Sequence, residues 1–181
     1  MLKDVTLTVQ GREAEVTNIT VEHGNNGLSK VRVDGVILPP KIKRRVLLTG
    51  VGGFVASHAL AHLMTHTDWE IVGTDSFRHR GKTDRIAEMF RKHPEWRERF
   101  YCVTHDLTAP FSSQMIEQIG KIDYIVNYAS ESHVDRSQAD PLNFTENNVS
   151  STLQMLEYAR KHVPKVFLQF STDEVYGAMQ H

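Results

Sequence analysis

Three residues near the end of the chain, Thr172, Asp173 and Glu174, place a hydroxyl and two adjacent carboxyl groups just after the apolar run "KVFLQF". Adjacent carboxyl groups can have their pKa values pushed apart, so that one is protonated and the other ionised, as acid–base catalysis requires. The carboxyl end of a strand is also where open α/β sheets bind their ligands. By themselves these residues more often belong to a solvated acidic turn after a strand, so their interpretation depends on the rest of the sequence.

A glycine-rich turn, "LLTGVGGFVASH", provides the second group of candidate residues. Gly50, Gly53 and Ala56 form a G-x-x-G-x-x-A pattern between an apolar run and an expected helix. A tight strand-to-helix turn needs a residue without a Cβ clash at Gly50, and Gly53 lets backbone N–H groups approach a pyrophosphate. We therefore predict a dinucleotide site here, and we include Phe54 and Val55, the next two residues, among its cofactor-binding candidates.

Asp75 ends the next expected strand, 22 residues after Gly53. A carboxylate at that position accepts hydrogen bonds from the adenosine ribose hydroxyls and repels a 2′-phosphate, which favours NAD over NADP. Basic residues just beyond it weaken this preference without reversing it: Arg78, Arg80 and Lys82. We therefore predict NAD as the cofactor.

Asp106 ends the third expected strand, "FYCVTHD". Its carboxylate could reach the adenine amine of a dinucleotide, or it could act as an ordinary cap at the end of the strand. Both roles stay open at this point, and we include Asp106 and Leu107 among the cofactor-binding candidates.

The elements that would hold these residues alternate between strand and helix from about residue 45 onwards. Expected strands lie in "RVLLTG", "WEIVGTD", "FYCVTHD", "IDYIVNYA" and "KVFLQF". The expected helices cover about 53–64, 84–92, 112–119 and 140–161, the last with Val149, Leu153 and Leu156 on one apolar stripe. Such alternation with short connections predicts an α/β fold with a Rossmann-type, doubly wound parallel sheet.

The first forty residues have a different pattern, of short strands separated by turn signals. Val5, Leu7 and Val9 alternate with polar residues, and "GNNG" at 24–27 marks a turn before another strand. We expect a small antiparallel β meander over residues 1–40, followed by an NAD-binding domain over 41–181. The basic stretch "KIKRR" that opens the second domain is interpreted as a solvated linker.

Three histidines, His58, His62 and His66, are spaced four residues apart and share one face of the first expected helix. Two of them could chelate zinc in principle. The apolar stripe of that helix runs elsewhere, and no cysteine or acidic cluster completes a site, so we expect no bound metal.

The overall composition limits the classes of partner. The chain has 181 residues and a formal net charge of −1, which gives no reason to expect nucleic acid or an anionic membrane as a partner. No apolar run is long enough to span a membrane. Cys102 is the only cysteine, so an internal disulfide is impossible and we expect a cytoplasmic protein.

Two further motifs resemble those of a known family. The stretch "NYASESHVDRS" at 127–137 resembles the fourth-strand segment of extended short-chain dehydrogenases/reductases that act on nucleotide sugars, the NAD-dependent epimerase/dehydratase family. The stretch "FSTDEVYG" at 170–177 resembles the fifth-strand segment of its dTDP-glucose 4,6-dehydratase branch. This resemblance implies that NAD⁺ oxidises the sugar at C4, that water is lost across C5 and C6, and that the hydride returns to C6.

The resemblance also implies roles for individual residues. Glu174 would be the base for the C5 proton, Asp173 the acid for the C6 hydroxyl, and Thr172 a hydrogen-bonding group for the C4 oxygen. Asp135 and Arg136 are expected to form an ion pair that orders their loop. The remaining matched candidates are Ala129 and Asn148 on the cofactor side, and Ser132 and His133, which either line the substrate or shape the loop.

The tyrosine–lysine pair that oxidises the substrate in this family, Y-x-x-x-K, does not occur in the sequence. We therefore expect a cofactor-binding half of such an enzyme, ending before that helix and the substrate-binding region, and inactive alone. Its expected partners are a nucleotide-sugar substrate and either a second copy of the chain or a complementing C-terminal half. Two alternatives stay open: a non-catalytic NAD-binding or scaffold module that docks a partner through the meander, and a related epimerase or decarboxylase, which the Asp173–Glu174 pair argues against.

Overall fold

The computed structural model describes residues 7–9, 12–23, 29–37, 43–78 and 82–177. The chain divides into two compact units, Met1–Ile42 and Lys43–His181. Several features singled out in the sequence lie outside the described residues: Val5, the "GNNG" turn, the first two residues of "KIKRR", and Arg80.

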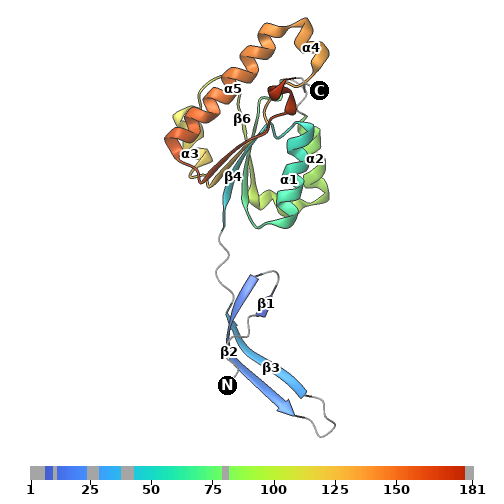
Figure 1. The fold of residues 1–181 in the computed structure, drawn as a ribbon, viewed down its shortest axis with the longest axis vertical. Coiled ribbons are helices and arrows are strands. Elements are labelled where there is room, and N and C mark those ends of the chain that lie inside the picture. Colours follow the sequence, from blue (N-terminus) through green and yellow to red (C-terminus); the bar gives the residue numbers. More distant parts are fainter. Residues whose placement is uncertain (1–6, 10–11, 24–28, 38–42, 79–81, 178–181) are drawn as a thin grey trace. The chain divides into compact units, whose positions relative to one another are not determined.

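The first unit contains an antiparallel three-stranded sheet with the order β1-β2-β3 (Figure 1). Its strands are β1 (Leu7–Val9), β2 (Arg12–His23) and β3 (Ser29–Ile37). The alternating pattern of the first forty residues thus forms the meander that we expected.

The second unit is built on five parallel strands in the order β6-β5-β4-β7-β8. They are β4 (Arg45–Thr49), β5 (Glu70–Asp75), β6 (Phe100–Thr104), β7 (Tyr124–Asn127) and β8 (Val166–Gln169). The chain adds strands first on one side of β4 and then on the other, which confirms the predicted doubly wound parallel sheet. In such sheets ligands bind at the carboxyl ends of the strands where the winding direction changes, here between β4 and β7.

Helices cover both faces of this sheet (Figure 1). One face carries α1 (Phe54–His66) and α2 (Thr83–Lys92), and the other carries α3 (Ser113–Ile119) and α5 (Pro141–His162). The shorter elements are η1 (Pro94–Arg99), α4 (Val134–Ala139) and η2 (Asp173–Tyr176).

The core lies on both faces of β4, because successive side chains of a strand point to opposite faces. Val46 and Leu48 pack in the cluster that includes Leu60 of α1, whereas Leu47 packs in the cluster that includes Met155 of α5. All five side chains are almost completely buried. This two-sided burial explains why β4 is a continuous apolar run instead of an alternating one.

Local signals fix the start of α5. The Asp140 carboxylate accepts a 3.2 Å hydrogen bond from the backbone N–H of Asn143, and Pro141 occupies the first helical position. Both features stabilise a helix N-terminus, since its first N–H groups lack partners within the helix. The helix begins at the start of the range 140–161 that the sequence predicted.

The apolar stripe noted on α5 faces away from the sheet. Val149, Leu153 and Leu156 are about half exposed, at 60%, 56% and 48%. The helix instead buries a second stripe, of Phe144, Ser151, Met155 and Tyr158. The two stripes have the same spacing and are offset by two residues, about 200° around a helix, so periodicity alone did not identify the buried one.

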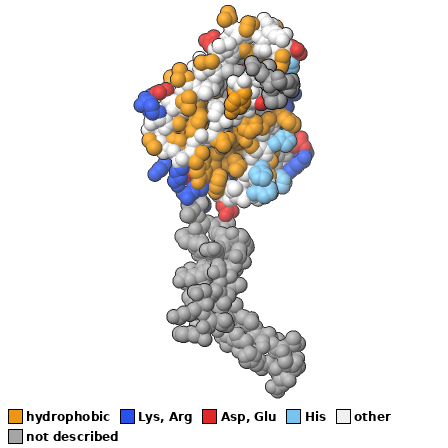
Figure 2. All heavy atoms as spheres, in the orientation of Figure 1, with side chains coloured by type: hydrophobic (Ala, Val, Ile, Leu, Met, Phe, Trp, Pro, Cys, Tyr) orange, Lys and Arg blue, Asp and Glu red, His pale blue; other side chains and the backbone are white. Residues whose placement is uncertain are grey.

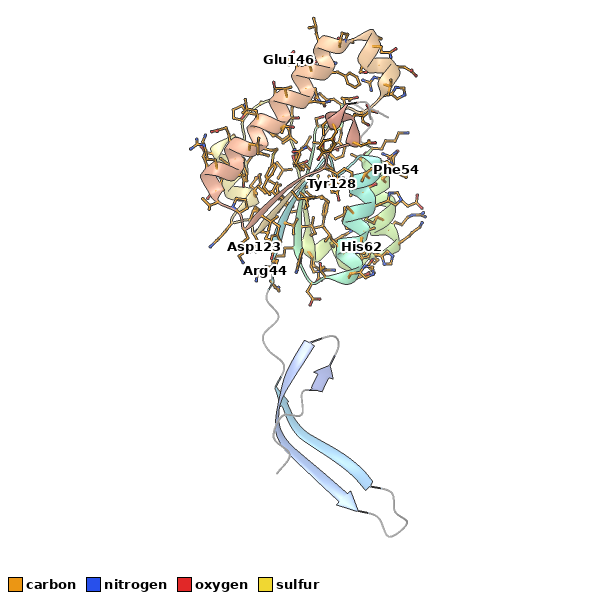
Figure 3. All side chains as sticks on the ribbon, in the orientation of Figure 1. Arg44, Phe54, His62, Asp123, Tyr128 and Glu146 are labelled. Atoms are coloured by element: carbon orange, nitrogen blue, oxygen red, sulfur yellow. The ribbon has the colours of Figure 1, made fainter. Side chains whose placement is uncertain are left out.

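Asp123 connects the amino ends of three strands. Its carboxylate accepts hydrogen bonds from the Arg45 backbone N–H at 3.0 Å and pairs with the Lys165 ammonium at 2.7 Å and the Arg44 guanidinium at 3.4 Å. Figure 3 shows Arg44 and Asp123 together at this end of the sheet. The hydrogen bond from Lys165, followed by that from Arg45, holds the pKa of Asp123 below its ordinary value.

β8 forms one edge of the parallel sheet, and its side chains are partly open to solvent. Val166, Leu168 and the following Phe170 are each about half exposed. Figure 2 shows hydrophobic side chains gathered over the part of the visible face where Figure 1 draws β8. None of the helices in the described part of the chain combines the length and the hydropathy that a membrane span requires.

Candidate cofactor-binding site

A pocket of about 540 Å³ opens at the carboxyl ends of β4, β5, β6 and β7. This volume lies within the usual range for small-molecule and cofactor sites. Nine residues predicted from the sequence line it: Gly50, Gly53, Phe54, Asp75, Asp106, Leu107, Ala129, Ser132 and His133. Residues that sequence reasoning did not assign to the site complete the wall: Ser76, Arg85, His105, Tyr128, Ser130, Glu131, Asn147 and Ser151.

The glycine turn passes very close to the end of β7. Gly50 has a φ of +65°, and a Cβ added there would lie 3.1 Å from the backbone N and Cα of Ala129. Only glycine adopts such a conformation at no steric cost, and only glycine leaves room for this approach. The Gly53 N–H then closes the turn on the Gly50 carbonyl at 2.8 Å, directly before α1 begins.

Gly52, at the centre of the turn, is held through both of its backbone polar groups. Its N–H donates to Asp75 Oδ2 at 2.9 Å, and its carbonyl accepts from the Lys82 N–H at 3.0 Å and from Arg85 Nη1 at 2.8 Å. The turn is therefore tied to β5 and to α2. Arg85 carries no motif that would have predicted this contact, which joins residues 33 positions apart.

The two predicted aspartates stand at the ends of neighbouring strands. Asp75 Oδ1 accepts from the Phe77 N–H at 2.8 Å, while Asp106 Oδ1 accepts from the N–H and hydroxyl of Thr108 at 3.1 and 2.9 Å. The second oxygen of Asp106 pairs with Arg78. Burial raises the pKa of the Asp106 carboxyl, but the Thr108 hydrogen bonds and the Arg78 charge outweigh it, so the pKa lies below its ordinary value and Asp106 is ionised at neutral pH.

Thr49 fixes the segment that carries Ala129 into the pocket wall. Its buried hydroxyl accepts hydrogen bonds from the backbone N–H groups of Tyr128 and Ala129 at 3.1 and 3.0 Å. The same hydroxyl donates to Asn127 Oδ1 at 2.5 Å, and Asn127 Nδ2 donates to Gln169 Oε1 at 2.8 Å. This chain of bonds links the carboxyl ends of β4, β7 and β8.

Asn148 anchors the loop that follows β7. Its side-chain oxygen accepts from the Glu131 N–H at 2.8 Å, and its side-chain nitrogen donates to the Glu131 carbonyl at 2.9 Å. The residue is not itself part of the pocket wall. The Glu131 carboxylate pairs with the Arg136 guanidinium at 3.1 Å. Arg136 therefore pairs with a residue five positions earlier in the loop, and not with Asp135 as expected.

Thr172, Asp173 and Glu174 follow the edge strand β8. Thr172 occupies the N-cap position of the 3-10 helix η2 without a capping hydrogen bond from its side chain. The first residues of η2 are the two acids, and all three residues are exposed. They lie beyond the carboxyl end of β8, and β7 stands between β8 and β4 in the sheet. None of the three residues belongs to the pocket wall. Val55, about half exposed, is likewise not part of the wall.

The sequence matches the family model described as GDP-mannose 4,6 dehydratase over residues 47–181. The chain belongs to this family. The match starts inside β4 and includes the glycine turn, both pocket aspartates and the residues after β8.

Several curated relatives of this family member are named as dehydratases. The chain is 31% identical to a dTDP-glucose 4,6-dehydratase of Escherichia coli, with 76% of this chain and 39% of the relative covered. It is 34% identical to a dTDP-glucose 4,6-dehydratase of Streptomyces griseus, with 75% and 40% covered. The chain thus spans about 40% of the length of the curated relatives it matches.

Solved structures show the same fold in this family. A dTDP-glucose 4,6-dehydratase of Streptomyces venezuelae with bound NAD and TYD aligns with a TM-score of 0.66 at 31% identity, covering 76% of this chain and 42% of that one. The UDP-Glc/GlcNAc 4-epimerase of Campylobacter jejuni aligns with a TM-score of 0.62 at 26% identity, covering 74% and 39%. The relatives of this chain therefore include both nucleotide-sugar dehydratases and epimerases.

The histidines of α1 contact their own helix in this family member. His62 and His66 stack with ring centroids 4.2 Å apart, and His58 Nδ1 lies 2.8 Å from the Phe54 carbonyl oxygen. Figure 2 shows histidine side chains together on one flank of the visible face, and Figure 3 labels His62 on α1. In the part of the chain that the structure describes, no group of three or more histidine, cysteine or acidic side chains could hold a metal ion.

Proposed function

We propose that this chain binds NAD and contributes to a nucleotide-sugar 4,6-dehydratase of the dTDP-glucose type. The observation that supports this most directly is the composition of one pocket wall, which joins the Gly50 turn, two strand-end aspartates and the Ala129 segment. In doubly wound sheets, dinucleotide sites combine a glycine turn and strand-end carboxylates at the place where the winding direction changes.

The residues of the pocket fit a dinucleotide in shape and charge. The first turn of α1 contains no acidic residue, so its N-terminus offers backbone N–H groups and a positive dipole end to a pyrophosphate. Each carboxylate oxygen can accept a further hydrogen bond, so Asp75 can still accept from ribose hydroxyls while it holds Gly52. His133 Nδ1 is buried in this wall, and no group among the described residues forms a hydrogen bond with it, so a bound molecule could supply one.

The proposed chemistry needs a hydride acceptor, a base for the C4 hydroxyl proton, and two further proton-transfer groups for the loss of water. In this family the tyrosine of a Y-x-x-x-K pair is the base for the C4 hydroxyl, and that pair does not occur in this sequence. NAD, held by the Gly50 turn and Asp75, would supply the hydride acceptor for C4 of the sugar and the hydride donor for C6. Glu174 would accept the C5 proton, Asp173 would protonate the departing C6 hydroxyl, and Thr172 would hydrogen-bond the C4 oxygen. These roles rest on the motif match, and because the chain spans about 40% of its relatives, we propose them only as this segment's contribution to the reaction.

Calorimetric titration of the 181-residue chain with NAD⁺ tests the proposal. We expect saturable binding that weakens about 10- to 100-fold in Asp75→Ala, because hydrogen bonds to a charged group are lost. Glu95→Gln, which removes an exposed carboxylate outside the pocket wall, should leave the affinity unchanged. Absence of saturable binding at millimolar NAD⁺ would reject the proposal and favour a non-catalytic scaffold role.

A second candidate is a nucleotide-sugar 4-epimerase, which the alignment with the Campylobacter jejuni enzyme favours. The two activities are separated by their products. A dehydratase releases water and yields a 4-keto-6-deoxy sugar, whereas an epimerase inverts C4 and retains every atom of its substrate.

A further inference from the structure

An ion pair crosses the edge of the pocket between the segments that follow β5 and β6. Arg78, three residues after Asp75, donates from Nη2 to Asp106 Oδ2. The Arg78 side chain is 57% exposed and that of Asp106 32% exposed, so solvent reaches the pair. Both aspartates belong to the pocket wall, and the arginine is bound to one of them.

Each partner of this pair is held in place by its own loop. Thr108 fixes the other oxygen of Asp106 through two hydrogen bonds. On the β5 side, Asp75 accepts the N–H of Phe77, whose left-handed backbone, with a φ of +54°, precedes Arg78. The Asp106 carboxylate therefore meets Arg78 from a fixed position, and formation of the pair needs little further ordering of the acid.

The pair lies next to the position where a dinucleotide site binds the adenosine ribose. In doubly wound dinucleotide sites, the carboxylate at the end of the second strand binds the ribose 2′-hydroxyl, and a nearby arginine accommodates the 2′-phosphate of NADP. Asp75 holds the position of that carboxylate, and Arg78 is a cation close to it in the chain. A guanidinium that is already paired with a carboxylate must give up that pair before it can bind a phosphate.

We propose that Asp106 is a cofactor-specificity residue, which favours NAD over NADP by pairing with Arg78 and withholding its guanidinium from a 2′-phosphate. The inference rests on the proposed dinucleotide function. It adds that Asp106 is the residue that disfavours the 2′-phosphate of NADP. Asp75, Asp106 and Arg78 together carry a net charge of −1, from two carboxylates and one guanidinium. Loss of the Asp106 charge brings this sum to zero and frees the only cation of the three.

Titration of the full chain with NAD⁺ and with NADP⁺ measures the ratio of the two dissociation constants. We expect wild type to prefer NAD⁺, and Asp106→Asn to shift the ratio about ten-fold or more toward NADP⁺, since an arginine–phosphate bond becomes available. The ratio is the readout because any contact between Asp106 and the adenine affects both cofactors equally. Asp135→Asn, which removes an exposed carboxylate outside the pocket wall, is the matched control and should leave the ratio at its wild-type value.

The double variant Asp106→Asn/Arg78→Ala shows whether a shift in the ratio comes from the freed guanidinium or from the lost Asp106 charge. Its three-residue sum returns to −1, and we expect its ratio to return to within about three-fold of wild type, because no guanidinium remains to bind the phosphate. An unchanged ratio in Asp106→Asn, or a shift that persists in the double variant, would overturn the inference. A wild-type chain that binds neither dinucleotide would instead overturn the proposed function itself, so the two failures give different results.

Discussion

The Thr49 hydroxyl donates a 2.5 Å hydrogen bond to the side-chain oxygen of Asn127, and both side chains are completely buried. This bond joins the last residues of β4 and β7. The winding of the chain through the sheet reverses between these two strands. Because the same hydroxyl accepts the N–H of Ala129, it also sets the distance between Ala129 and the glycine turn.

Thr49→Val tests the contribution of this hydroxyl to stability. Valine has nearly the same shape, but it leaves two backbone N–H groups and the Asn127 oxygen without their partner. We expect the free energy of unfolding to fall by about 3 kcal/mol, since buried polar groups without partners are costly. Urea denaturation measures it, with Thr49→Ser as the control that keeps the hydroxyl; equal losses in the two variants would contradict this account.

Gly50→Ala tests the close approach between the glycine turn and β7. The new Cβ would meet the Ala129 backbone at 3.1 Å in a left-handed conformation. We expect a loss of about 3 kcal/mol in unfolding free energy, from backbone strain and a forced displacement together. Gly177→Ala is the matched control, because Gly177 also has a positive φ, +75°, but an added Cβ would have no atom of the described residues within 4 Å; it should cost about 1 kcal/mol. If both variants cost the same, the contact with Ala129 contributes nothing.

Asp123 should make the stability of the chain depend on pH in the acidic range. Its pKa is lowered in the folded state, chiefly by the Lys165 hydrogen bond, so the unfolded chain binds more protons once the pH approaches 3.8. Its contribution is therefore complete above that pH and is lost as the pH falls below it. We expect Asp123→Asn to be less stable than wild type at pH 7 and to lose less stability between pH 5 and about pH 2.5. Chemical denaturation over this range measures both slopes, and parallel slopes would exclude this role of Asp123.

The orientation of α5 predicts opposite outcomes at two neighbouring positions. Leu153 is 56% exposed and Met155 is completely buried. Leu153→Ala should change the unfolding free energy by less than about 0.5 kcal/mol, whereas Met155→Ala should cost about 3 kcal/mol through lost contacts and a cavity. Thermal and urea unfolding of both variants decide the point, and a larger loss at Leu153 would mean that the outer stripe is covered.

Much of the fold follows from local sequence signals. The run Val46–Leu48 is apolar because both faces of β4 are covered. Ser112 and Asp140 are N-cap residues whose side chains accept backbone N–H bonds, as their types predict. These signals act over a few residues, so a single sequence is enough to interpret them. The parallel sheet and the glycine turn are predictable for the same reason.

Contacts between distant side chains had no such signal. Thr49 and Asn127 are 78 positions apart, and Arg78 and Asp106 are 28 apart, so only the folded topology brings them together. Polar residue types at strand ends predict that these side chains gather at one edge of the sheet, but not which of them pair. The position of Thr172–Glu174 illustrates this limit: the motif places them after β8, while the distance to the pocket depends on the strand order.

The contacts of Gly52 have a consequence for the kinetics of cofactor association. Since its N–H and its carbonyl are both engaged by groups of the protein itself, the conformational entropy of ordering this turn is lost during folding and not when a ligand arrives. A receptor whose loop is ordered in advance needs no slow rearrangement after the first encounter. Stopped-flow traces should accordingly contain a single phase whose rate rises in proportion to ligand concentration, with no plateau.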